Sequence, residues 1–338
     1  YAPTGRYSAW RMYARITGVG AFIPERRVNN FELEKIIPTS DAWIQENIGV
    51  ITRSVIAPGE TIAGMGTKAA REALTKSGCE DIGLVICATN SPDTLYPATA
   101  CRITHELDLG FVPAYDLQAG CTGFLYALAQ AKLFVESAGK SALVIGSDAL
   151  STGFHWSGDR NAVLFGDGAG AAVLGLADAA QQQADRGVLS VHLYADGTQA
   201  ESLSIPGGGS RYPTSAETLA AGQHFIHMAG KVIFTHAVRN LASACQAALK
   251  HQGLRPSDID LVVAHQANLR IVEALAQRLE LPMDKFFINI GKYGNTSSAS
   301  VPIALDEAVR AGRVKPGDRL LFCALGAGLA WGSACVRW

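Results

Sequence analysis

The segment Ala70-Arg-Glu-Ala-Leu-Thr-Lys-Ser-Gly78, followed by Asp81-Ile-Gly-Leu-Val85, decides the fold because the chain contains it twice. The second copy is Ala247-Ala-Leu-Lys-His-Gln-Gly253, followed by Asp258-Ile-Asp-Leu-Val262. In each copy a helical pattern ends at a glycine, as left-handed helix caps do, and a short apolar strand begins. The repeat indicates that two halves of the chain share one fold.

The repeat extends to two residues that can carry chemistry. Cys121 and Asn295 each precede a helical pattern, and these patterns end at Gly139 and Gly312 after nearly equal spacings. A strand pattern follows each glycine. We therefore expect a duplicated α/β protein in which Cys121 and Asn295 occupy equivalent helix-start positions and face one shared cleft.

Strand and helix patterns alternate along the chain, which indicates a layered α/β fold. The apolar runs are short and rich in β-branched residues, as is typical of strands covered on both faces. The expected strands are 15–23, 82–88, 142–146, 171–176, 260–264 and 319–324, and the expected helices are 65–77, 122–136, 229–251 and 300–311.

Composition excludes several classes of protein. The 338 residues include 29 Lys and Arg against 30 Asp and Glu, so no global field favours nucleic acid or an anionic membrane. The longest uncharged apolar run, 320–336, contains three glycines and predicts a buried strand and turn instead of a membrane span. Seven cysteines without a C-x-x-C spacing argue against a disulfide framework or a zinc site, so we expect a cytoplasmic protein without a metal.

Cys121, in Gln118-Ala-Gly-Cys-Thr-Gly-Phe124, is the candidate nucleophile. A tight turn places this thiol at the start of an amphipathic helix. Free backbone N–H groups and the positive helix end lower the pKa of a thiol, so we expect a thiolate. The other cysteines are expected to be small buried apolar residues; they are Cys79, Cys87, Cys101, Cys245, Cys323 and Cys335.

A nucleophilic cysteine needs partners that move protons or stabilise charge on an acyl oxygen. His265 follows a predicted strand, at the edge where open α/β sheets bind ligands. Asn295 could equally be a helix N-cap, and its equivalence to Cys121 favours a role in the site. The glycine-rich segments lack a dinucleotide fingerprint and a P-loop, so no nucleotide cofactor is expected. The turn within 325–332 can direct a peptide N–H toward an oxyanion.

Five motifs, in order, resemble those of β-ketoacyl-acyl-carrier-protein synthase III of the thiolase superfamily. They lie at 119–124, 166–173, 265–271, 294–302 and 331–334. The resemblance implies a duplicated five-layer α/β/α/β/α fold and a homodimer. It also implies an N-terminal half over 12–178 carrying the cysteine and a C-terminal half over 179–338 carrying the histidine and asparagine. Residues 1–11 are then an extension or a cloning remnant.

The same resemblance implies a reaction. Cys121 takes an acyl group from a thioester, while His265 and Asn295 stabilise a second, malonyl-type thioester on acyl carrier protein as it decarboxylates and forms a C–C bond. The backbone N–H groups of Cys121 and Ala327 would hold the first oxyanion. No cofactor is implied beyond the phosphopantetheine or coenzyme A that the substrates carry.

The resemblance implies substrate contacts as well. Trp43 and Arg160 would flank the adenine of coenzyme A or the mouth of the pantetheine tunnel, and Lys231 stands where an asparagine often contacts pantetheine. Arg270 would meet the acidic acyl carrier protein. Tyr96 would reach across the dimer and close the partner's acyl pocket.

Departures from the family pattern concern the substrate more than the chemistry. After Trp43 the family usually reads Thr-Arg-Thr-Gly-Ile-Arg, whereas this chain reads Glu46-Asn-Ile-Gly-Val-Ile51 and loses two arginines, one of which usually helps to bind coenzyme A. Tyr96 replaces phenylalanine, Lys231 replaces asparagine and Ala327 replaces glycine. We therefore expect transfer between carrier-bound chains in a specialised polyketide or antibiotic pathway.

Other functions can use the same residues. Joining two β-ketoacyl chains into a pyrone without decarboxylation, or transferring the acyl group to an alcohol or amine, begins with the same acyl-Cys121. A papain-like protease has the order of Cys121, His265 and Asn295 but needs a Cys-Gly-Ser-Cys-Trp segment that is missing here. A non-catalytic dimer partner predicts loss of the nucleophile, which this chain retains.

Overall fold

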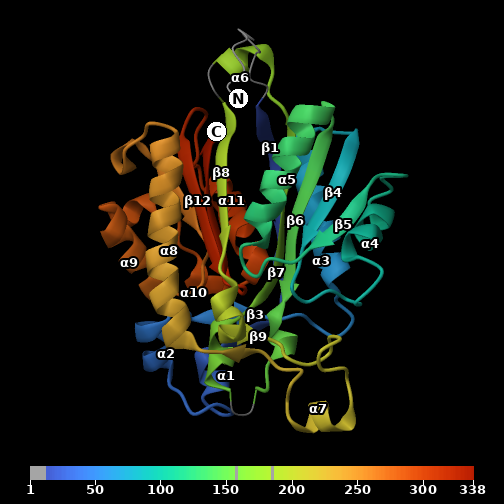
Figure 1. Ribbon diagram of the computed structural model, residues 1–338, viewed down its shortest axis with the longest axis vertical. Coiled ribbons are helices and arrows are strands. Elements are labelled where there is room, and N and C mark those ends of the chain that lie inside the picture. The colour runs from blue at the N-terminus through green and yellow to red at the C-terminus, as the bar shows by residue number, and fades with distance from the viewer. Residues whose placement is uncertain (1–12, 157–158, 184–185) are drawn as a thin grey trace.

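Two stacked β-sheets form the frame of the computed structural model, which describes residues 13–156, 159–183 and 186–338 (Figure 1). The sheets have the strand orders β1-β7-β6-β4-β5 and β11-β12-β13-β8. The predicted extension over 1–11 lies outside the described residues. The strands of the first sheet are β1 (Ala14–Phe22), β4 (Ile82–Ala88), β5 (Ala114–Leu117), β6 (Ser141–Ala149) and β7 (Asp167–Leu176). Those of the second are β8 (Gly187–Ala195), β11 (Leu261–Ala264), β12 (Arg319–Gly326) and β13 (Ala330–Arg337).

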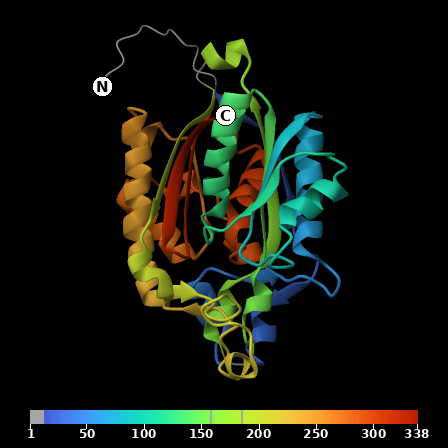
Figure 2. The same cartoon turned by 45° about the vertical axis from the view of Figure 1, so that its right-hand side comes forward.

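Helices cover both sheets and fill the space between them. Three apolar clusters hold the layers together: α3 and α4 pack outside the first sheet, α5 and α11 pack between the sheets, and α8 and α9 pack outside the second (Figures 1 and 2). The predicted five-layer α/β/α/β/α fold is therefore confirmed. The helices are α3 (Ile62–Ser77), α4 (Thr99–Glu106), α5 (Gly123–Ala138), α8 (Gly230–His251), α9 (Leu269–Leu279) and α11 (Ser300–Arg310).

The duplicated segments fold alike. The first runs from α3 into β4 and the second from α8 into β11, and the glycines between them, Gly78 and Gly253, both have a φ of +64°. β4 is parallel to β5 and β6, and β11 is parallel to β12. β7 is antiparallel to β1 and β6, and β13 is antiparallel to β12 and β8. Each half thus contributes a mixed sheet.

The apolar run at 320–336 differs from its prediction. It forms two antiparallel strands, β12 and β13, instead of one strand and a turn. The chain reverses between Gly326 and Ala330, and buried residues on both sides of this turn complete the core. Within the described ranges, no helix is long and apolar enough to cross a bilayer.

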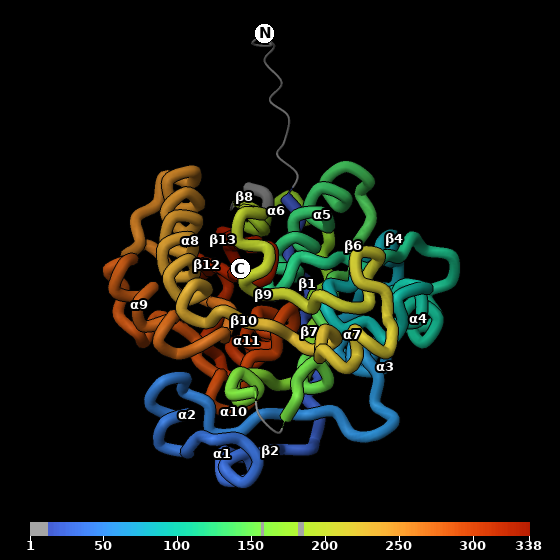
Figure 3. Tube along the Cα trace, turned by 60° about the horizontal axis from the view of Figure 1, so that its bottom comes forward, coloured from blue at the N-terminus to red at the C-terminus, as the bar shows by residue number. Residues whose placement is uncertain are grey.

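Short elements gather at one end of the layers (Figure 3). An apolar cluster of their own holds several of them together. They are β2 (Arg27–Asn29), α1 (Asn30–Leu33), α2 (Asp41–Asn47), β3 (Thr52–Ser54), β9 (Leu203–Ser204), α7 (Ala216–Ala220), β10 (His227–Met228) and α10 (Ile290–Tyr293). The remaining helical turns are η1 (Leu150–Gly153), η2 (Arg160–Leu164), α6 (Ala179–Gln183), η3 (Gly197–Ser202), η4 (Pro256–Asp258), η5 (Met283–Lys285) and η6 (Ser297–Ala299).

A glycine in β6 lets the two halves approach closely. A Cβ added to Gly146 would lie 2.3 Å from the carbonyl oxygen of Ser298, so the backbone of η6 rests directly on the first sheet. Any other residue at this position would push η6 and the start of α11 away. This contact places the segment that contains Asn295 beside the half that contains Cys121.

Candidate functional site

Cys121, His265 and Asn295 line one cavity of about 350 Å³ between the two halves. All three are nearly buried: Cys121 is 7% exposed, and His265 and Asn295 are 5% exposed. Cys121 also lines a second cavity of about 410 Å³. The sulfur-bearing residue therefore stands where two cavities meet, and the predicted shared cleft is present.

Backbone hydrogen bonds place His265 and Asn295 at the cavity wall. The His265 N–H donates to the carbonyl of Cys323 at 2.8 Å, which holds His265 directly after β11. The Asn295 N–H donates to the carbonyl of Leu164 at 2.8 Å. The side-chain oxygen of Asn295 accepts from the N–H of Ser297 at 2.8 Å, so its NH2 group remains for a ligand. The N-cap residues of η6 and α11 are Thr296 and Ala299, one and four positions after Asn295.

Two turns meet next to Cys121. A Cβ on Gly120 would lie 2.4 Å from the backbone nitrogen of Ala327, and one on Gly326 would lie 2.1 Å from that of Cys121. Only glycines at these positions allow the two turns to touch. Cys121 and Ala327 both line the second cavity, so the structure brings together the two residues predicted to hold the first oxyanion.

The electrostatics of Cys121 correct the sequence-based expectation of a thiolate. Burial raises the pKa of the Cys121 thiol to about 12, with a smaller raising contribution from Asp148, against a hydrogen bond from Ser297 that lowers it. The first N–H groups after the cysteine, those of Thr122 and Gly123, donate to turn carbonyls at 3.2 and 3.1 Å instead of to the sulfur. The environment of the thiol therefore favours its protonated form.

His265 is uncharged for the same reason. Burial lowers the pKa of its imidazole to about 3, and its buried Nδ1 atom has no hydrogen-bond partner among the described residues. A neutral imidazole can still donate one hydrogen bond, as an amide can. Across the residues that the structure describes, no three His, Cys, Asp and Glu side chains are grouped to hold a metal ion.

The outer part of the first cavity contains the predicted mouth residues. The guanidinium carbon of Arg160 lies 4.7 Å from the ring centroid of Trp43, and Asn47 belongs to the same wall. Arg270 lies outside the cavity, where its Nε donates to the carbonyl of Glu46 at 2.9 Å. Because Glu46 belongs to α2, this bond places Arg270 next to the helix that carries Trp43, and the Arg270 side chain is half exposed.

Lys231 is the predicted contact that the structure does not bring to a cavity. It is exposed, whereas Gly230, Phe234, Ala237 and Leu241 of the same helix line the first cavity. Lining residues recur every three or four positions along α8, so a side chain at 231 projects from another part of the helix surface. Lys231 thus lines neither of these two cavities, and its contact with pantetheine stays a prediction.

Tyr96 does not line either cavity of its own chain. Its side chain is 85% exposed on the segment before α4. Such an exposed position is the one that a contact across a dimer requires.

Apolar side chains that sequence reasoning missed form much of the second cavity. They come from separate segments of the chain, so no periodic pattern connects them. They are Leu150, Phe165, Leu203, Ile205 and Ile226.

Two polar groups near the sulfur were also not predicted. The Ser297 hydroxyl lies 3.5 Å from the sulfur of Cys121, and Asn90 Nδ2 lies 3.2 Å from that hydroxyl. The sequence signal for Ser297 is the polar run 295–298, which directly precedes an apolar helix. Polar runs are usually exposed, whereas this one is buried.

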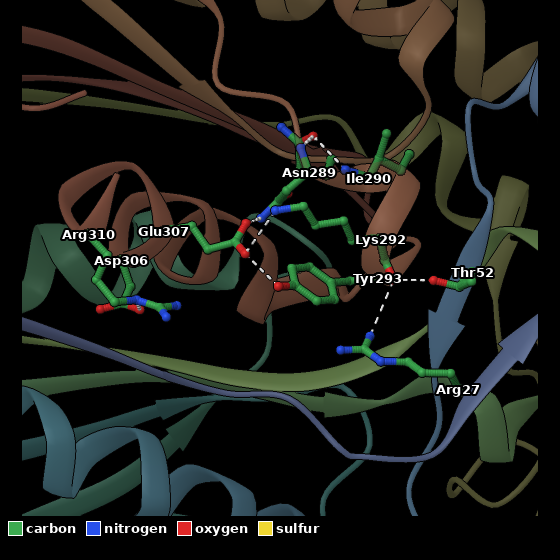
Figure 4. Close-up of polar contacts among 10 residues, drawn as sticks. Arg27, Thr52, Asn289, Ile290, Lys292, Tyr293, Asp306, Glu307 and Arg310 are labelled. Atoms are coloured by element: carbon green, nitrogen blue, oxygen red, sulfur yellow. Dashed lines mark hydrogen bonds and ion pairs between the residues drawn. The ribbon is translucent and has the colours of Figure 1, made fainter. Parts of the chain in front are cut away.

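A carboxylate on α11 holds the segment that leads to Asn295 (Figure 4). Glu307 accepts hydrogen bonds from the Tyr293 hydroxyl and from Asn289 Nδ2, the latter at 2.9 Å, and lies 3.4 Å from Lys292 Nζ. On the other side, the Lys292 carbonyl accepts from Thr52 at 2.7 Å. α10 is thus fixed from both the α11 side and the β3 side.

Comparisons with known proteins agree with this arrangement. The family model described as 3-Oxoacyl-[acyl-carrier-protein (ACP)] synthase III matches residues 115–197, and the one for its C terminal part matches residues 249–338. A beta-ketoacyl-[acyl-carrier-protein] synthase III from Caldanaerobacter subterraneus is 44% identical over 97% of this chain and 98% of its own length. The corresponding protein of Clostridioides difficile is 43% identical over 96% and 98%.

Solved structures show the same similarity. A 3-oxoacyl-[acyl-carrier-protein] synthase III from Aquifex aeolicus is 40% identical and matches with a TM-score of 0.88 over 96% of this chain and 100% of its own. The priming beta-ketosynthase of the R1128 polyketide biosynthetic pathway is 34% identical, with a TM-score of 0.88 over 99% and 98%.

Substituting Glu307→Ala should destabilise the protein. The change leaves the Tyr293 hydroxyl and the Asn289 amide without their partner, which costs about 1–3 kcal/mol. Urea unfolding followed by circular dichroism measures the loss. Glu201→Ala removes a carboxylate from an exposed pair with Arg211 and should change the unfolding free energy by less than about 1 kcal/mol. Equal losses in both variants would contradict an anchoring role for Glu307.

Proposed function

This chain belongs to the 3-oxoacyl-[acyl-carrier-protein] synthase III family and is a condensing acyltransferase, and from that premise we propose that Cys121 is the residue that carries the acyl group. The observation that carries this proposal is the position of Cys121 at the junction of the two cavities. One cavity can admit the thioester arm while the other holds the acyl chain.

Acyl loading begins with attack of the Cys121 sulfur on the donor carbonyl. The new S–C bond forms, the donor C–S bond breaks, and the departing thiolate takes the proton that the buried Cys121 thiol gives up. The N–H groups of Cys121 and Ala327 stabilise the intermediate oxyanion. The contact of their two turns, which needs Gly120 and Gly326, supports this assignment.

Condensation uses His265 and Asn295. The carbonyl oxygen of an extender thioester, malonyl-type and bound to acyl carrier protein, accepts hydrogen bonds from the two side chains. Loss of carbon dioxide leaves an enolate whose carbon attacks the acyl-Cys121 carbonyl; the C–C bond forms, the S–C bond breaks, and the sulfur leaves with the electron pair. Two neutral donors support this step because their hydrogen bonds stabilise the enolate anion, and no ion pair has to be broken when the product leaves.

The donor is proposed to be acyl carrier protein instead of free coenzyme A. Asn47 occupies the position of the first arginine that the family pattern carries, and it lines the cavity beside Trp43 and Arg160. A carboxamide cannot pair with a phosphate as a guanidinium does. Arg270, half exposed near this mouth, is proposed to meet the acidic carrier protein.

A second copy of the chain is proposed to complete the acyl cavity. β5 is the last strand of its sheet, and Leu95, Tyr96 and Phe111, from segments close to it in the chain, are strongly exposed. An unpaired strand edge beside exposed apolar side chains favours pairing with another chain. In this homodimer Tyr96 reaches the partner's acyl cavity.

A specialised pathway is supported by the changed mouth and by the similarity to a priming synthase of polyketide biosynthesis. Pyrone formation from two β-ketoacyl chains and acyl transfer to an alcohol or amine remain second candidates, since both begin with acyl-Cys121. Release of carbon dioxide on mixing loaded enzyme with the second chain distinguishes condensation of a malonyl-type extender from these reactions.

The compartment and cofactor are also proposed. All seven cysteines lie in the described part of the chain and have free thiols, which supports a reducing cytoplasm. The substrate's own phosphopantetheine supplies the thioester, so the steps above need no further group.

Variants of the three central residues should separate the two half-reactions. Cys121→Ala should show no acyl adduct by intact-mass measurement after incubation with an acyl thioester. His265→Ala and Asn295→Ala should still load but condense about a hundredfold more slowly, because each removes one donor to the enolate. His251→Ala, an exposed histidine at the end of α8, should behave as wild type. An adduct that persists in Cys121→Ala ends the proposal for this residue.

Donor choice should respond to position 47. Wild type should load faster from acyl carrier protein than from the matching coenzyme A thioester. Asn47→Arg should raise loading from coenzyme A on the order of tenfold by supplying a charged hydrogen-bond donor. Rates are followed by mass in single turnovers. If wild type prefers coenzyme A and Asn47→Arg changes nothing, the mouth does not select the donor.

Tyr96→Ala should widen the range of acyl chains accepted while leaving the oligomer dimeric in light scattering. Removing the ring enlarges the partner's cavity, so chains longer than the preferred one should load faster relative to it. Tyr212→Ala, another exposed tyrosine, serves as control. An unchanged chain-length profile, or a monomeric wild-type protein, would contradict the contact across the dimer.

A further inference from the structure

A serine hydroxyl that the mechanism above does not use lies next to the sulfur. Ser297 Oγ is 3.5 Å from Cys121 Sγ, and Ser297 is 1% exposed. Asn90, Cys121 and Ser297 all line the second cavity. Ser297 thus lies on the side of Cys121 that faces the second cavity, whereas His265 lines the first.

Asn90 determines where the hydroxyl proton points. Its Nδ2 lies 3.1 Å from the carbonyl oxygen of Gly120, 3.1 Å from a carboxylate oxygen of Asp148 and 3.2 Å from Ser297 Oγ. Because a carbonyl oxygen can only accept, the NH2 end of Asn90 and not its oxygen faces these groups. The Asn90 NH2 group cannot accept and shares its two protons among these three acceptors, so the single proton of Ser297 Oγ is not used toward Asn90 and can be donated to the sulfur.

Asp148 fixes Asn90 in turn. This buried carboxylate accepts from the Asn90 N–H at 2.6 Å, from the Ser298 N–H at 3.0 Å and from the Ser298 hydroxyl at 2.6 Å. It joins no ion pair among the described residues. Asp148, near the end of β6, therefore connects the segment after β4, which contains Asn90, to η6, which contains Ser297 and Ser298.

The backbone of Ser297 is strained in a way that fits this placement. Its φ is +54°, a left-handed value that non-glycine residues rarely adopt. Its N–H donates to the side-chain oxygen of Asn295 at 2.8 Å. One residue thus contacts Cys121 through its side chain and Asn295 through its backbone, and the surrounding hydrogen bonds maintain the strain.

We propose that Ser297 is a further catalytic residue, which donates a hydrogen bond to the Cys121 sulfur, and that Asn90 and Asp148 are the residues that position it. This inference rests on the proposed role of Cys121. A hydroxyl binds a thiolate more strongly than a neutral thiol. Ser297 therefore acts at both points where charge develops on the sulfur: when the thiol gives up its proton during loading, and when the sulfur leaves with its electron pair during condensation. Ser297 keeps its own proton throughout.

Alkylation of Cys121 tests the hydrogen bond without any acyl donor. The second-order rate constant for iodoacetamide, followed by mass on the peptide that contains Cys121, should fall about tenfold in Ser297→Ala at each pH from about 7 to 10, because a lost hydrogen bond to a charged atom shifts a pKa by about one unit. Ser297→Gly should show the same fall, and it folds readily because glycine favours a positive φ. Asn90→Ala should show a smaller fall in the same direction.

Matched controls and the second half-reaction complete the test. Ser333→Ala removes another buried hydroxyl, which donates to the Ala244 carbonyl at 2.7 Å, and should alkylate as wild type. Single-turnover loading and condensation should both slow in Ser297→Gly, whereas His265→Ala should slow condensation alone. Alkylation within twofold of wild type in Ser297→Gly would overturn the inference. A Cys121 that alkylates as described here but never carries an acyl group would instead overturn the proposed function.

Discussion

The contact of η6 with β6 is the constraint on which the site depends. Gly146 lets the Ser298 backbone rest on the first sheet, and this brings the segment with Asn295 and Ser297 from the C-terminal half next to Cys121 of the N-terminal half. The apolar layer that α5 and α11 form between the sheets keeps this arrangement rigid. A site assembled from two halves needs such rigidity, because a catalytic group misplaced by an ångström loses much of its effect.

Burial favours the neutral forms of Cys121 and His265. It raises the pKa of the Cys121 thiol and lowers that of the His265 imidazole. Neutral hydrogen-bond donors can stabilise a negative charge without the desolvation cost of a buried cation. Asn295 and His265 can donate to an enolate, and Ser297 can donate to the sulfur. Charge develops only during the reaction, when these donors are already in place.

The two cavities divide recognition between different surfaces. Trp43 and Arg160 meet at the wall of the first cavity, and Leu150, Ile205 and Ile226 are among the residues that line the second. In the proposed function, separate sets of residues contact the head of the donor and the acyl chain, so substitutions at the mouth can change the donor while the chemistry at Cys121 stays the same. This separation explains how the chain can keep the motifs of its family and still differ at positions 46–51.

The repeat, the apolar periods and the glycine stops determined the layered α/β fold, the main helices and strands, and the residues Cys121, His265 and Asn295, because each of these signals is local in the chain. Tertiary structure alone decided three things. It raised the pKa of the Cys121 thiol, since burial depends on what packs around the thiol, and it left Lys231 exposed while other positions of α8 line the first cavity. It also placed Ser297 against the sulfur through Asn90 and Asp148, because residues far apart in sequence form a hydrogen-bond network only after the halves have packed.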